Sequence, residues 1–439
     1  MLPRSRPLRA VAALGGIALI ATALAACSSG GSSSDGKVSI TFLTQNAETN
    51  VTQGKAQIAA FEKAYPNITV KMDNQPAGTE GDNLMKTKLS TGDMDDVFYY
   101  NSGSLLQALH PDTTLVDLSD QSWVKDLSKD FKTVVSTDKG LYGAPYGTSL
   151  GGGVLYNKKV YEKLGLKVPT DWAEFLSNSE KIKADAPDVA PIIQSFGDTW
   201  TSQLFVLGDF ANVATQDPEW ATNYTDNKAK YVDEPGLEGF NHQAETFKDG
   251  LYNKDFASIT NAQAMTMLAT GAGAQYPMLS ASIATVQQNN PDAVNDIGFF
   301  ALPADKAANT AATIWQPNAL YIPKTTTGAK LDAAKKFVAF ANSKEGCDVQ
   351  NKTVTPSGPY VTSACTLPSD VPALIGDLQK YFDSGKTAPA LEFLSPIKGP
   401  NLENITVQVG SGISTAKQGA ALYDDDVKKQ AQQLGLKGW

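Results

Sequence analysis

Gly147-Thr148-Ser149-Leu150-Gly151 has the Gly-X-Ser-X-Gly spacing in which a serine can act as the nucleophile of a hydrolysis reaction. That chemistry needs a histidine base later in the chain, and only His242 is available there. His242 falls in the middle of a predicted amphipathic helix, and the motif begins at a glycine-rich stretch instead of opening a clear helix. These residues therefore argue against a hydrolase.

The other reactive side chains form no distinctive catalytic or metal-binding pattern. Acids are plentiful enough for a glycoside-cleaving carboxylate pair, but no pair has a special sequence context. Neither His110 nor His242 has a second His or a Cys at a ligand spacing, so we expect no metal site and no cofactor. No phosphate-binding P-loop motif occurs. The chain is therefore not expected to be an enzyme.

The N-terminal residues indicate export and lipid attachment. Three Arg precede an apolar run from Ala10 to Ala26, which is the pattern of a signal peptide at residues 1–26. Leu24-Ala25-Ala26-Cys27 resembles a bacterial lipobox, in which Cys27 becomes the first mature residue and carries lipid. The alternative is an ordinary secretory signal with a chance cysteine. Residues 27–36 are rich in Ser and Gly and form a predicted tether. We expect a lipid-anchored protein on the extracytoplasmic face of the cell membrane.

Cys347 and Cys365 are the remaining cysteines, an even pair 18 positions apart. In an exported protein such a pair is expected to form a disulfide. The alternative is two unpaired buried thiols.

The length and the charge of the chain limit which folds and which partners are expected. A chain of 439 residues exceeds what one hydrophobic core usually serves, so two lobes are expected. The formal charge of −9 becomes −12 when the signal, with three Arg and no acid, is removed. An acidic surface does not favour nucleic acid. After Ala26 no apolar run is long enough to span a bilayer.

Alternating strand and helix patterns predict an α/β fold. Val38–Leu43 is a predicted buried strand, and Ile58, Phe61 and Tyr65 recur at helical spacing before Pro66. Further strands are predicted near residues 68–72, 97–100, 154–157, 297–302 and 320–322. Further helices are predicted near residues 84–91, 172–184, 235–249, 331–342 and 413–434. Asp171 and Glu174 are expected to form a capping box at the first turn of the second of these helices.

The mature chain resembles the extracellular solute-binding proteins of ABC importers, in the carbohydrate-binding group typified by maltose-binding protein. The segments that carry the resemblance are Ala60–Ile68, Leu89–Asp93, Asp96–Phe98, Tyr142–Tyr146, Leu155–Lys158, Val168–Phe175, Ala333–Phe337 and Lys344–Gly346. Each segment is weak alone, but their order and spacing behind a lipobox make the match specific.

The resemblance implies a two-lobed periplasmic-binding-protein-like α/β fold, with a ligand cleft between lobes joined by three hinge crossings. We expect lobe 1 to comprise residues 37–145 and 301–352, and lobe 2 to comprise residues 146–300 and 353–439. The crossings are expected near residues 143–150, 298–303 and 354–360. The resemblance also implies hinge closure around a saccharide and delivery to the transmembrane subunits of an ABC permease, with the protein acting as a monomer.

A sugar site needs aromatic faces for stacking and planar polar side chains for hydrogen bonds. In lobe 1, the turn after the first strand places Gln45, Asn46 and Glu48 at the expected cleft, or leaves them as solvated turn residues. Tyr99, Tyr100 and Asn101 end a strand, and by position Tyr100 matches a stacking aromatic of the family. The alternative is that one Tyr covers the sheet edge. Asp96 heads this strand and either contacts sugar or caps backbone amides.

The other candidates lie later in the chain. Asp198 and Trp200 fall where the family's second lobe makes contacts, with core packing as the alternative for Trp200. Tyr276 lies in a glycine-alanine strand that resembles one leading into the family's cleft, but the Trp that often follows is absent near Ala281. Further candidates are Trp315, Gln316, Asn318, Tyr360 and Asn401.

Several aromatic candidates favour an oligosaccharide over a monosaccharide. Two other functions remain open, a binding protein for a non-sugar polar solute and a surface glycan-binding scaffold. A ligand-induced change in compactness would separate a binding protein from a scaffold, and product formation from an oligosaccharide would reveal an enzyme.

Overall fold

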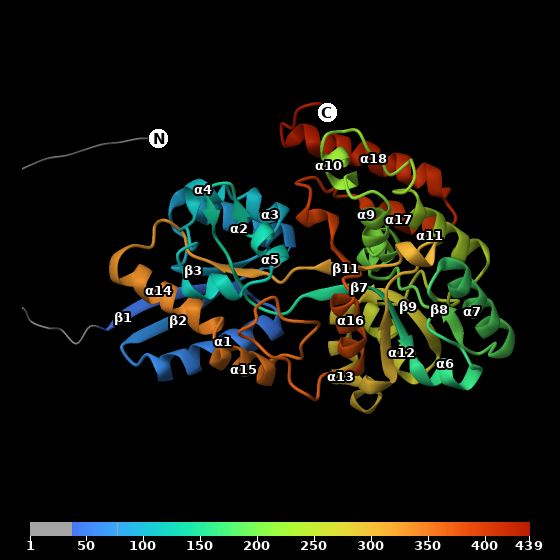
Figure 1. Cartoon of the computed structure of the whole chain (residues 1–439), viewed down its shortest axis with the longest axis horizontal. Coiled ribbons are helices and arrows are strands. Elements are labelled where there is room, and N and C mark those ends of the chain that lie inside the picture. The colour runs from blue at the N-terminus through green and yellow to red at the C-terminus, as the bar shows by residue number, and fades with distance from the viewer. Residues whose placement is uncertain (1–36, 77) are drawn as a thin grey trace, which may run out of the picture. The chain divides into compact units, whose positions relative to one another are not determined.

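The computed structural model describes residues 37–76 and 78–439, which fold around two main β-sheets (Figure 1). We call the part built on the sheet that contains β1 lobe 1, and the part built on the sheet that contains β7 lobe 2. The predicted signal peptide 1–26, the tether 27–36 and the lipidated Cys27 lie outside the described residues. Within the described residues, no helix is both long and apolar enough to cross a membrane.

Lobe 1 is a five-stranded sheet in the order β2-β1-β3-β12-β6. β1 pairs in parallel with β2 and β3, whereas β12 runs antiparallel to β3 and β6. The strands are β1 (Val38–Gln45), β2 (Ile68–Gln75), β3 (Val97–Tyr100), β6 (Ala144–Pro145) and β12 (Ala319–Tyr321). The helices include α1 (Glu48–Ala64), α2 (Gly78–Thr91), α3 (Ser104–Gln107), α4 (Pro111–Thr114), α5 (Lys129–Val134), α14 (Gly328–Ala341) and α15 (Lys344–Thr353).

Aromatic side chains join the helices of lobe 1 to its sheet. Phe42 of β1, Phe61 of α1 and Phe337 of α14 are fully buried. The ring of Phe337 lies 5.4 Å from that of Phe42 and 5.1 Å from that of Phe61, measured between centroids. These contacts explain the apolar spacing in α1, which ends at Ala64, just before Pro66.

Lobe 2 is a mixed sheet in the order β13-β11-β7-β9-β8, with β10 also paired to β7. The strands are β7 (Leu150–Asn157), β8 (Ala190–Ile192), β9 (Gly273–Leu279), β10 (Ile297–Phe300), β11 (Ala312–Trp315) and β13 (Thr387–Pro389). Among its helices are α6 (Lys158–Leu164), α7 (Trp172–Asp185), α12 (Asn261–Thr270), α13 (Ile283–Asn289) and α16 (Ala373–Asp383).

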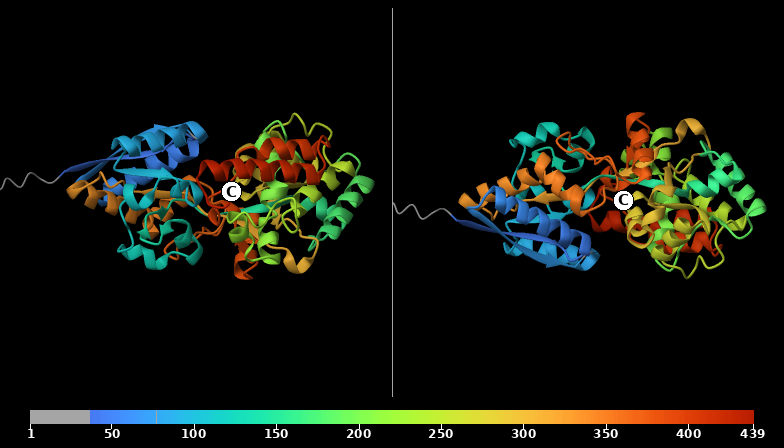
Figure 2. Two further views of the ribbon diagram at one scale, coloured as in Figure 1. Left: turned by 90° about the horizontal axis from the view of Figure 1, so that it is seen from above. Right: turned by 90° about the horizontal axis from the view of Figure 1, so that it is seen from below.

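A further group of helices packs on lobe 2. It consists of α8 (Leu204–Leu207), α9 (Phe210–Gln216), α10 (Trp220–Thr225), α11 (Glu238–Lys248), α17 (Leu402–Gly410) and α18 (Ala416–Gln433). α18 packs on α11 and α17, and Figure 2 shows this red C-terminal helix against the green elements of lobe 2. The helix predicted near residues 413–434 is α18, and α17 precedes it as a helix that the sequence analysis did not predict.

The predicted cap of α7 is present in modified form. The Asp171 side chain accepts a hydrogen bond from the backbone N–H of Glu174 at 3.0 Å. The Glu174 carboxylate, however, accepts from the backbone N–H of Thr170 at 2.7 Å, one residue before the expected partner. Both bonds satisfy amide groups at the start of the helix.

The chain passes from β6 of lobe 1 to β7 of lobe 2 through residues 146–149. The chain returns to lobe 1 at the second crossing, residues 316–318 between β11 and β12. The sequence analysis had placed this crossing near residues 298–303. β11 pairs antiparallel with β7, so residues 312–315 belong to lobe 2 and the predicted boundary after residue 300 is corrected. A strand pattern reveals a strand but not the sheet that it joins.

The third crossing is also longer than predicted. After α15, residues 361–363 return to lobe 1, where Ser128 N–H donates to Val361 O at 2.7 Å and Ser363 N–H donates to Asp126 O at 2.8 Å. Leu367 packs against the core of lobe 2. The predicted boundary after residue 352 therefore moves to about residue 366.

Candidate functional site

The strand registers bring one edge of each sheet to the crossings. In lobe 1, Tyr100 at the end of β3 pairs with Ala319, which in turn pairs with Pro145 just before the first crossing. In lobe 2, Trp315 pairs with Leu150 just after that crossing, and Gly152 pairs with Leu279 at the end of β9. We call these two edges and the crossings between them the interlobe region.

The turn after β1 supplies accessible polar groups to the interlobe region. Gln45 is half-buried, and its Oε1 accepts a hydrogen bond from Asn50 Nδ2 at 3.3 Å. Asn46 and Glu48 are exposed. These three side chains lie at the carboxyl end of a parallel strand, as the sequence predicted.

The two tyrosines of β3 face opposite sides of the sheet. Tyr99 is half-buried, and its hydroxyl accepts from Asn318 Nδ2 at 2.7 Å. Burial raises the pKa of Tyr99, which keeps its hydroxyl protonated. Tyr100 points to the other face and is 1% exposed, so it cannot stack on a ligand in this arrangement. Tyr99 and the half-buried Asn101 are therefore the better candidates of this segment.

The end of β11 carries an aromatic ring, and the second crossing that follows carries an unpaired amide oxygen. Trp315 is half-buried, and an added Cβ at Gly152 would lie 2.5 Å from its ring, so glycine makes room for this side chain. Gln316 is 7% exposed, and its Oε1 has no hydrogen-bond partner among the described residues. A buried acceptor without a partner is costly, so Gln316 Oε1 is suited to accept a hydroxyl from a ligand.

Asp198 and Trp200 lie beyond the carboxyl end of β8, in and before the short helix η2 (Thr199–Gln203). β8 pairs in parallel with β9, so these residues extend toward the same edge as Leu279. Trp200 is 38% exposed, which favours an available ring over core packing. Asp198 Oδ2 accepts from the backbone N–H of Asn261 at 2.7 Å.

Four candidates have structural surroundings that weaken the predicted role. Tyr276 is fully buried in β9, with its hydroxyl 2.5 Å from Ser195 Oγ. Asn401 is exposed before α17, and its Oδ1 accepts from Asn404 Nδ2. The Tyr360 hydroxyl donates to Asn351 Oδ1 at 2.8 Å, and Tyr360 lines a cavity of about 560 Å³ beside the third crossing. Sequence position alone could not reveal these partners.

Asp96 is the fourth, because it lies at the amino end of β3, away from the interlobe edge. Its carboxylate accepts from the backbone N–H of Thr41 at 2.9 Å and pairs with Lys330 Nζ at 3.0 Å. Of the two predicted roles, the capping role is the one that the structure supports.

Asp96→Ala is expected to lower the free energy of unfolding by about 2 kcal/mol, because it removes charged hydrogen bonds from a buried site. Ligand affinity should stay unchanged. Denaturant unfolding and ligand titration measure both effects, with the exposed Asp93→Ala as the control. Lower affinity at unchanged stability would return Asp96 to the ligand site.

The serine of the Gly-X-Ser-X-Gly motif is a structural group. Ser149 is fully buried, and its hydroxyl donates to Pro359 O at 2.7 Å. Ser280, which the sequence analysis did not select, donates to Ser357 O at 2.6 Å and accepts from Gly151 N–H at 2.9 Å. These bonds tie the first crossing to the third. His242 bonds to Asp305 instead of Ser149.

The predicted disulfide is present. Cys347 of α15 and Cys365 are bonded, with their Cα atoms 5.5 Å apart. The bridge holds residues 361–366 to lobe 1 just before the chain enters lobe 2.

Comparisons with known proteins agree with this architecture. Among curated relatives, the multiple sugar-binding protein of Streptococcus mutans is 27% identical over 338 residues, covering 74% of this chain and 77% of that protein. The melibiose/raffinose/stachyose-binding protein MelE of Bacillus subtilis is 23% identical, covering 78% of this chain and 79% of that protein.

Solved structures confirm the two-lobed α/β fold. The apo form of RafE from Streptococcus pneumoniae matches with a TM-score of 0.72 at 20% identity, over 91% of this chain and 98% of that chain. A sugar transporter from Bacillus licheniformis in complex with stachyose matches with a TM-score of 0.69 at 18% identity, over 89% of this chain and 100% of that chain.

The family model of the bacterial extracellular solute-binding proteins matches residues 48–346. These residues include α1, the strands of both sheets except β1 and β13, and the first two crossings. The match agrees with the prediction of a binding protein instead of an enzyme. Since it covers well over half of the sequence, this chain belongs to the family of bacterial extracellular solute-binding proteins.

Proposed function

We propose that this chain is the sugar-binding component of an ABC importer and that it binds an oligosaccharide in the interlobe region. The observation that carries the proposal is the combination there of exposed Trp200, half-buried Trp315 and the unpaired Oε1 of Gln316. Aromatic faces and planar amides match the flat C–H faces and hydroxyls of a sugar. Relatives named for raffinose and stachyose binding support this ligand class.

Binding would act through closure of the lobes. Gln45, Asn46, Glu48, Tyr99 and Asn101 belong to lobe 1, whereas Asp198 and Trp200 belong to lobe 2. A ligand that contacts both groups stabilises the arrangement in which they approach each other, so it shifts the population toward closure. The closed monomer is then the form that transmembrane permease subunits recognise.

A thermal-shift screen of the full chain tests the proposal. A ligand at 100 times its dissociation constant adds about 2.7 kcal/mol of stability, so raffinose, stachyose and other saccharides that bind should raise the melting temperature. Recovery of the sugar intact excludes hydrolysis. If only a non-sugar polar solute raised the melting temperature, the ligand class would be that solute and not sugar. If a sugar raised the melting temperature but X-ray scattering showed no change in compactness, the result would favour a surface glycan-binding scaffold.

Cys27 is proposed to carry the lipid that anchors the protein to the outer face of the membrane. Cys27→Ala is expected to release the protein into the medium or the soluble extracytoplasmic fraction, because the mature chain would then lack its anchor. Cell fractionation measures the release, with the disulfide variant Cys365→Ser as the matched cysteine control. Membrane retention of Cys27→Ala, or an unlipidated Cys27 by mass spectrometry, would contradict the anchor.

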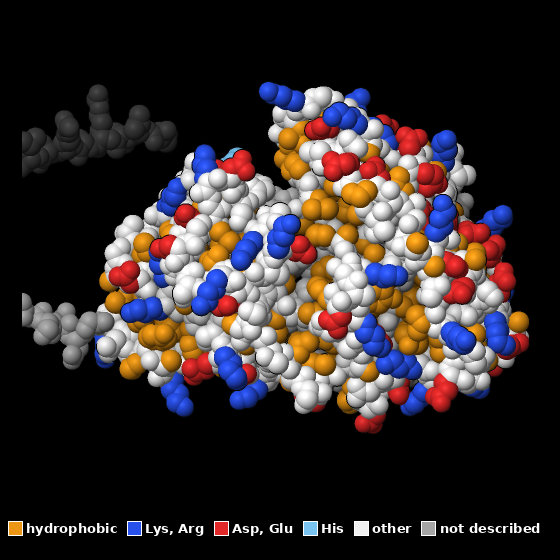
Figure 3. Space-filling view, viewed as in Figure 1, with side chains coloured by type: hydrophobic (Ala, Val, Ile, Leu, Met, Phe, Trp, Pro, Cys, Tyr) orange, Lys and Arg blue, Asp and Glu red, His pale blue; other side chains and the backbone are white. Residues whose placement is uncertain are grey.

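The face of the protein shown in Figure 3 carries charges of both signs. On this face, Lys and Arg side chains are interspersed with Asp and Glu, so that face presents no basic patch suited to nucleic acid.

A further inference from the structure

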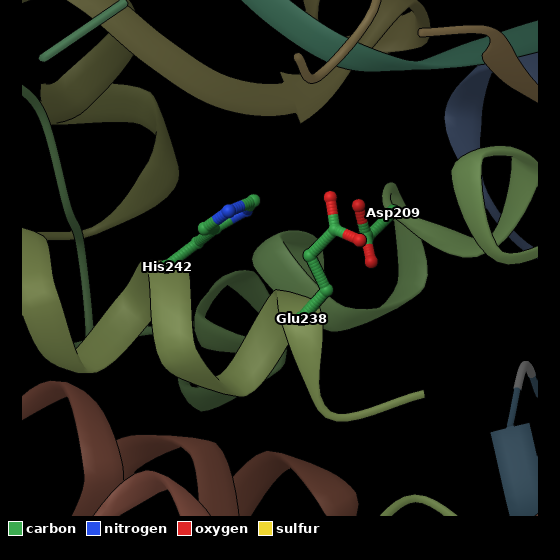
Figure 4. A group of neighbouring side chains, drawn as sticks. All are labelled: Asp209, Glu238 and His242. Carbon is green, nitrogen blue, oxygen red and sulfur yellow. The ribbon is translucent and has the colours of Figure 1, made fainter. Parts of the chain in front are cut away.

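We infer that Asp209, Glu238 and His242 form a binding site for a divalent transition-metal ion within lobe 2 (Figure 4). Asp209 directly precedes α9, and Glu238 and His242 lie one turn apart on α11. One nitrogen of His242 and one carboxylate oxygen from each acid lie within 4.8 Å of one another. The three residues are between 1% and 5% exposed. This site goes beyond the proposed function and does not depend on sugar binding.

Within the described residues, neither of the two carboxylates has a lysine partner. None of the Lys–carboxylate ion pairs in the described part of the chain includes Asp209 or Glu238. Their hydrogen-bond donors are neutral: Asn212 Nδ2 donates to Asp209 at 2.7 Å, and Gln216 Nε2 donates to Glu238 at 2.7 Å. Buried carboxylates are normally paired or bound to metal, so this arrangement calls for a cation or a proton.

His242 provides the second, independent indication of a ligand. Its Nε2 lies 3.0 Å from Asp305 Oδ1; in the neutral imidazole this hydrogen bond places the ring proton on Nε2 and leaves the lone pair on Nδ1. Nδ1 is buried and has no hydrogen-bond partner among the described residues. Figure 4 shows the ring extending toward the carboxylates of Glu238 and Asp209. A metal-bound histidine typically donates its other N–H to a carboxylate, as His242 does here.

Packing holds the imidazole in place. The ring of Trp172 stacks on that of His242, with 3.7 Å between centroids and 12° between planes. Glu238 Oε1 accepts a hydrogen bond from the backbone N–H of Asp305 at 2.9 Å. Asp305 therefore positions two of the three ligands, through its side chain and its backbone.

The donor set selects the class of ion. One imidazole nitrogen and two carboxylate oxygens suit Zn²⁺ and related transition metals, whereas Ca²⁺ prefers oxygen ligands alone. Water would complete the coordination. The sequence analysis expected no metal site because it looked for a second His or a Cys. The i, i+4 spacing of Glu238 and His242 was the available signal, but the third ligand directly precedes another helix, α9.

The test is equilibrium dialysis of the chelator-treated full chain against Zn²⁺, Mn²⁺ or Ca²⁺ alone, followed by elemental analysis. We expect one Zn²⁺ per chain, weaker Ca²⁺ binding, and a higher melting temperature with Zn²⁺ than with chelator. Asp209→Asn keeps an acceptor for Asn212 but removes the charge, so its zinc affinity should fall at least about tenfold. Asp305→Asn should show a smaller fall.

The exposed His110→Asn is the matched control and should bind zinc as the unaltered chain does. If Asp209→Asn and Glu238→Gln both bound zinc as tightly as the unaltered chain, the metal would be an adventitious ion only. That result would overturn the proposed site. The absence of stoichiometric Zn²⁺ or Mn²⁺ in the unaltered chain would do the same and would leave the carboxyl pair sharing a proton. That measurement decides the question even if a variant does not fold.

Discussion

Trp200→Ala is expected to weaken oligosaccharide binding by about 30-fold, which corresponds to about 2 kcal/mol, the size typical of a central aromatic contact. Trp200 is 38% exposed beyond the carboxyl end of β8, so its ring is available to a ligand. Loss of the stacking contact should destabilise the ligand complex more than it destabilises the free protein. Isothermal titration with the sugar found by thermal shift measures the effect, and the ligand-free melting temperature reports stability.

Tyr65→Ala is the matched control for this prediction. Tyr65 is 37% exposed, nearly the same as Trp200, but it follows α1 at the edge of lobe 1 opposite the interlobe region. It should leave affinity unchanged, and Trp200→Phe should retain part of the binding. Equal affinity in Trp200→Ala and the unaltered chain would remove Trp200 from the site, while leaving sugar binding itself intact.

Local sequence patterns predicted β1, β2, β3, β7, β10 and β12 and the longest helices, but not which sheet each strand joins. The Ile297–Leu302 run was visible as a strand, yet its pairing with β7 depends on contacts more than a hundred positions apart. The short β11 follows β10 after only the brief 3-10 helix η5 (Ala307–Asn309), and it also joins lobe 2. The second crossing was therefore predicted too early.

The sequence predicted which segments form the candidate site, but not always which residue in a segment faces it. Gln45, Asn46 and Glu48 follow from the rule that ligands bind beyond the carboxyl ends of strands. The choice between Tyr99 and Tyr100 did not follow, because adjacent residues of a strand face opposite sides and both are aromatic. Asp96, at the other end of the same strand, illustrates how a few residues decide between a ligand contact and a structural carboxylate.

Replacing both Cys347 and Cys365 by Ser is expected to lower the free energy of unfolding by about 3 kcal/mol. In the chain-entropy model, a bridge across 18 positions restricts the unfolded chain by this amount. The folded chain should also hold residues 361–366 less firmly, because the disulfide adds to the hydrogen bonds from Ser128 and Ser363. Denaturant unfolding measures the first effect, and hydrogen exchange in residues 361–366 measures the second.

Reduction of the unaltered chain provides the internal control for this prediction. The chain with a reduced disulfide and the double Ser variant should unfold at the same denaturant concentration, because both lack the bridge and keep similar side-chain volumes. Sugar affinity should change less than stability, since neither cysteine lies on the facing edges of the two sheets. If the double variant were as stable as the oxidised chain, the hydrogen bonds of residues 361–363 alone would hold the third crossing, and the loop-closure argument would be wrong for this bridge.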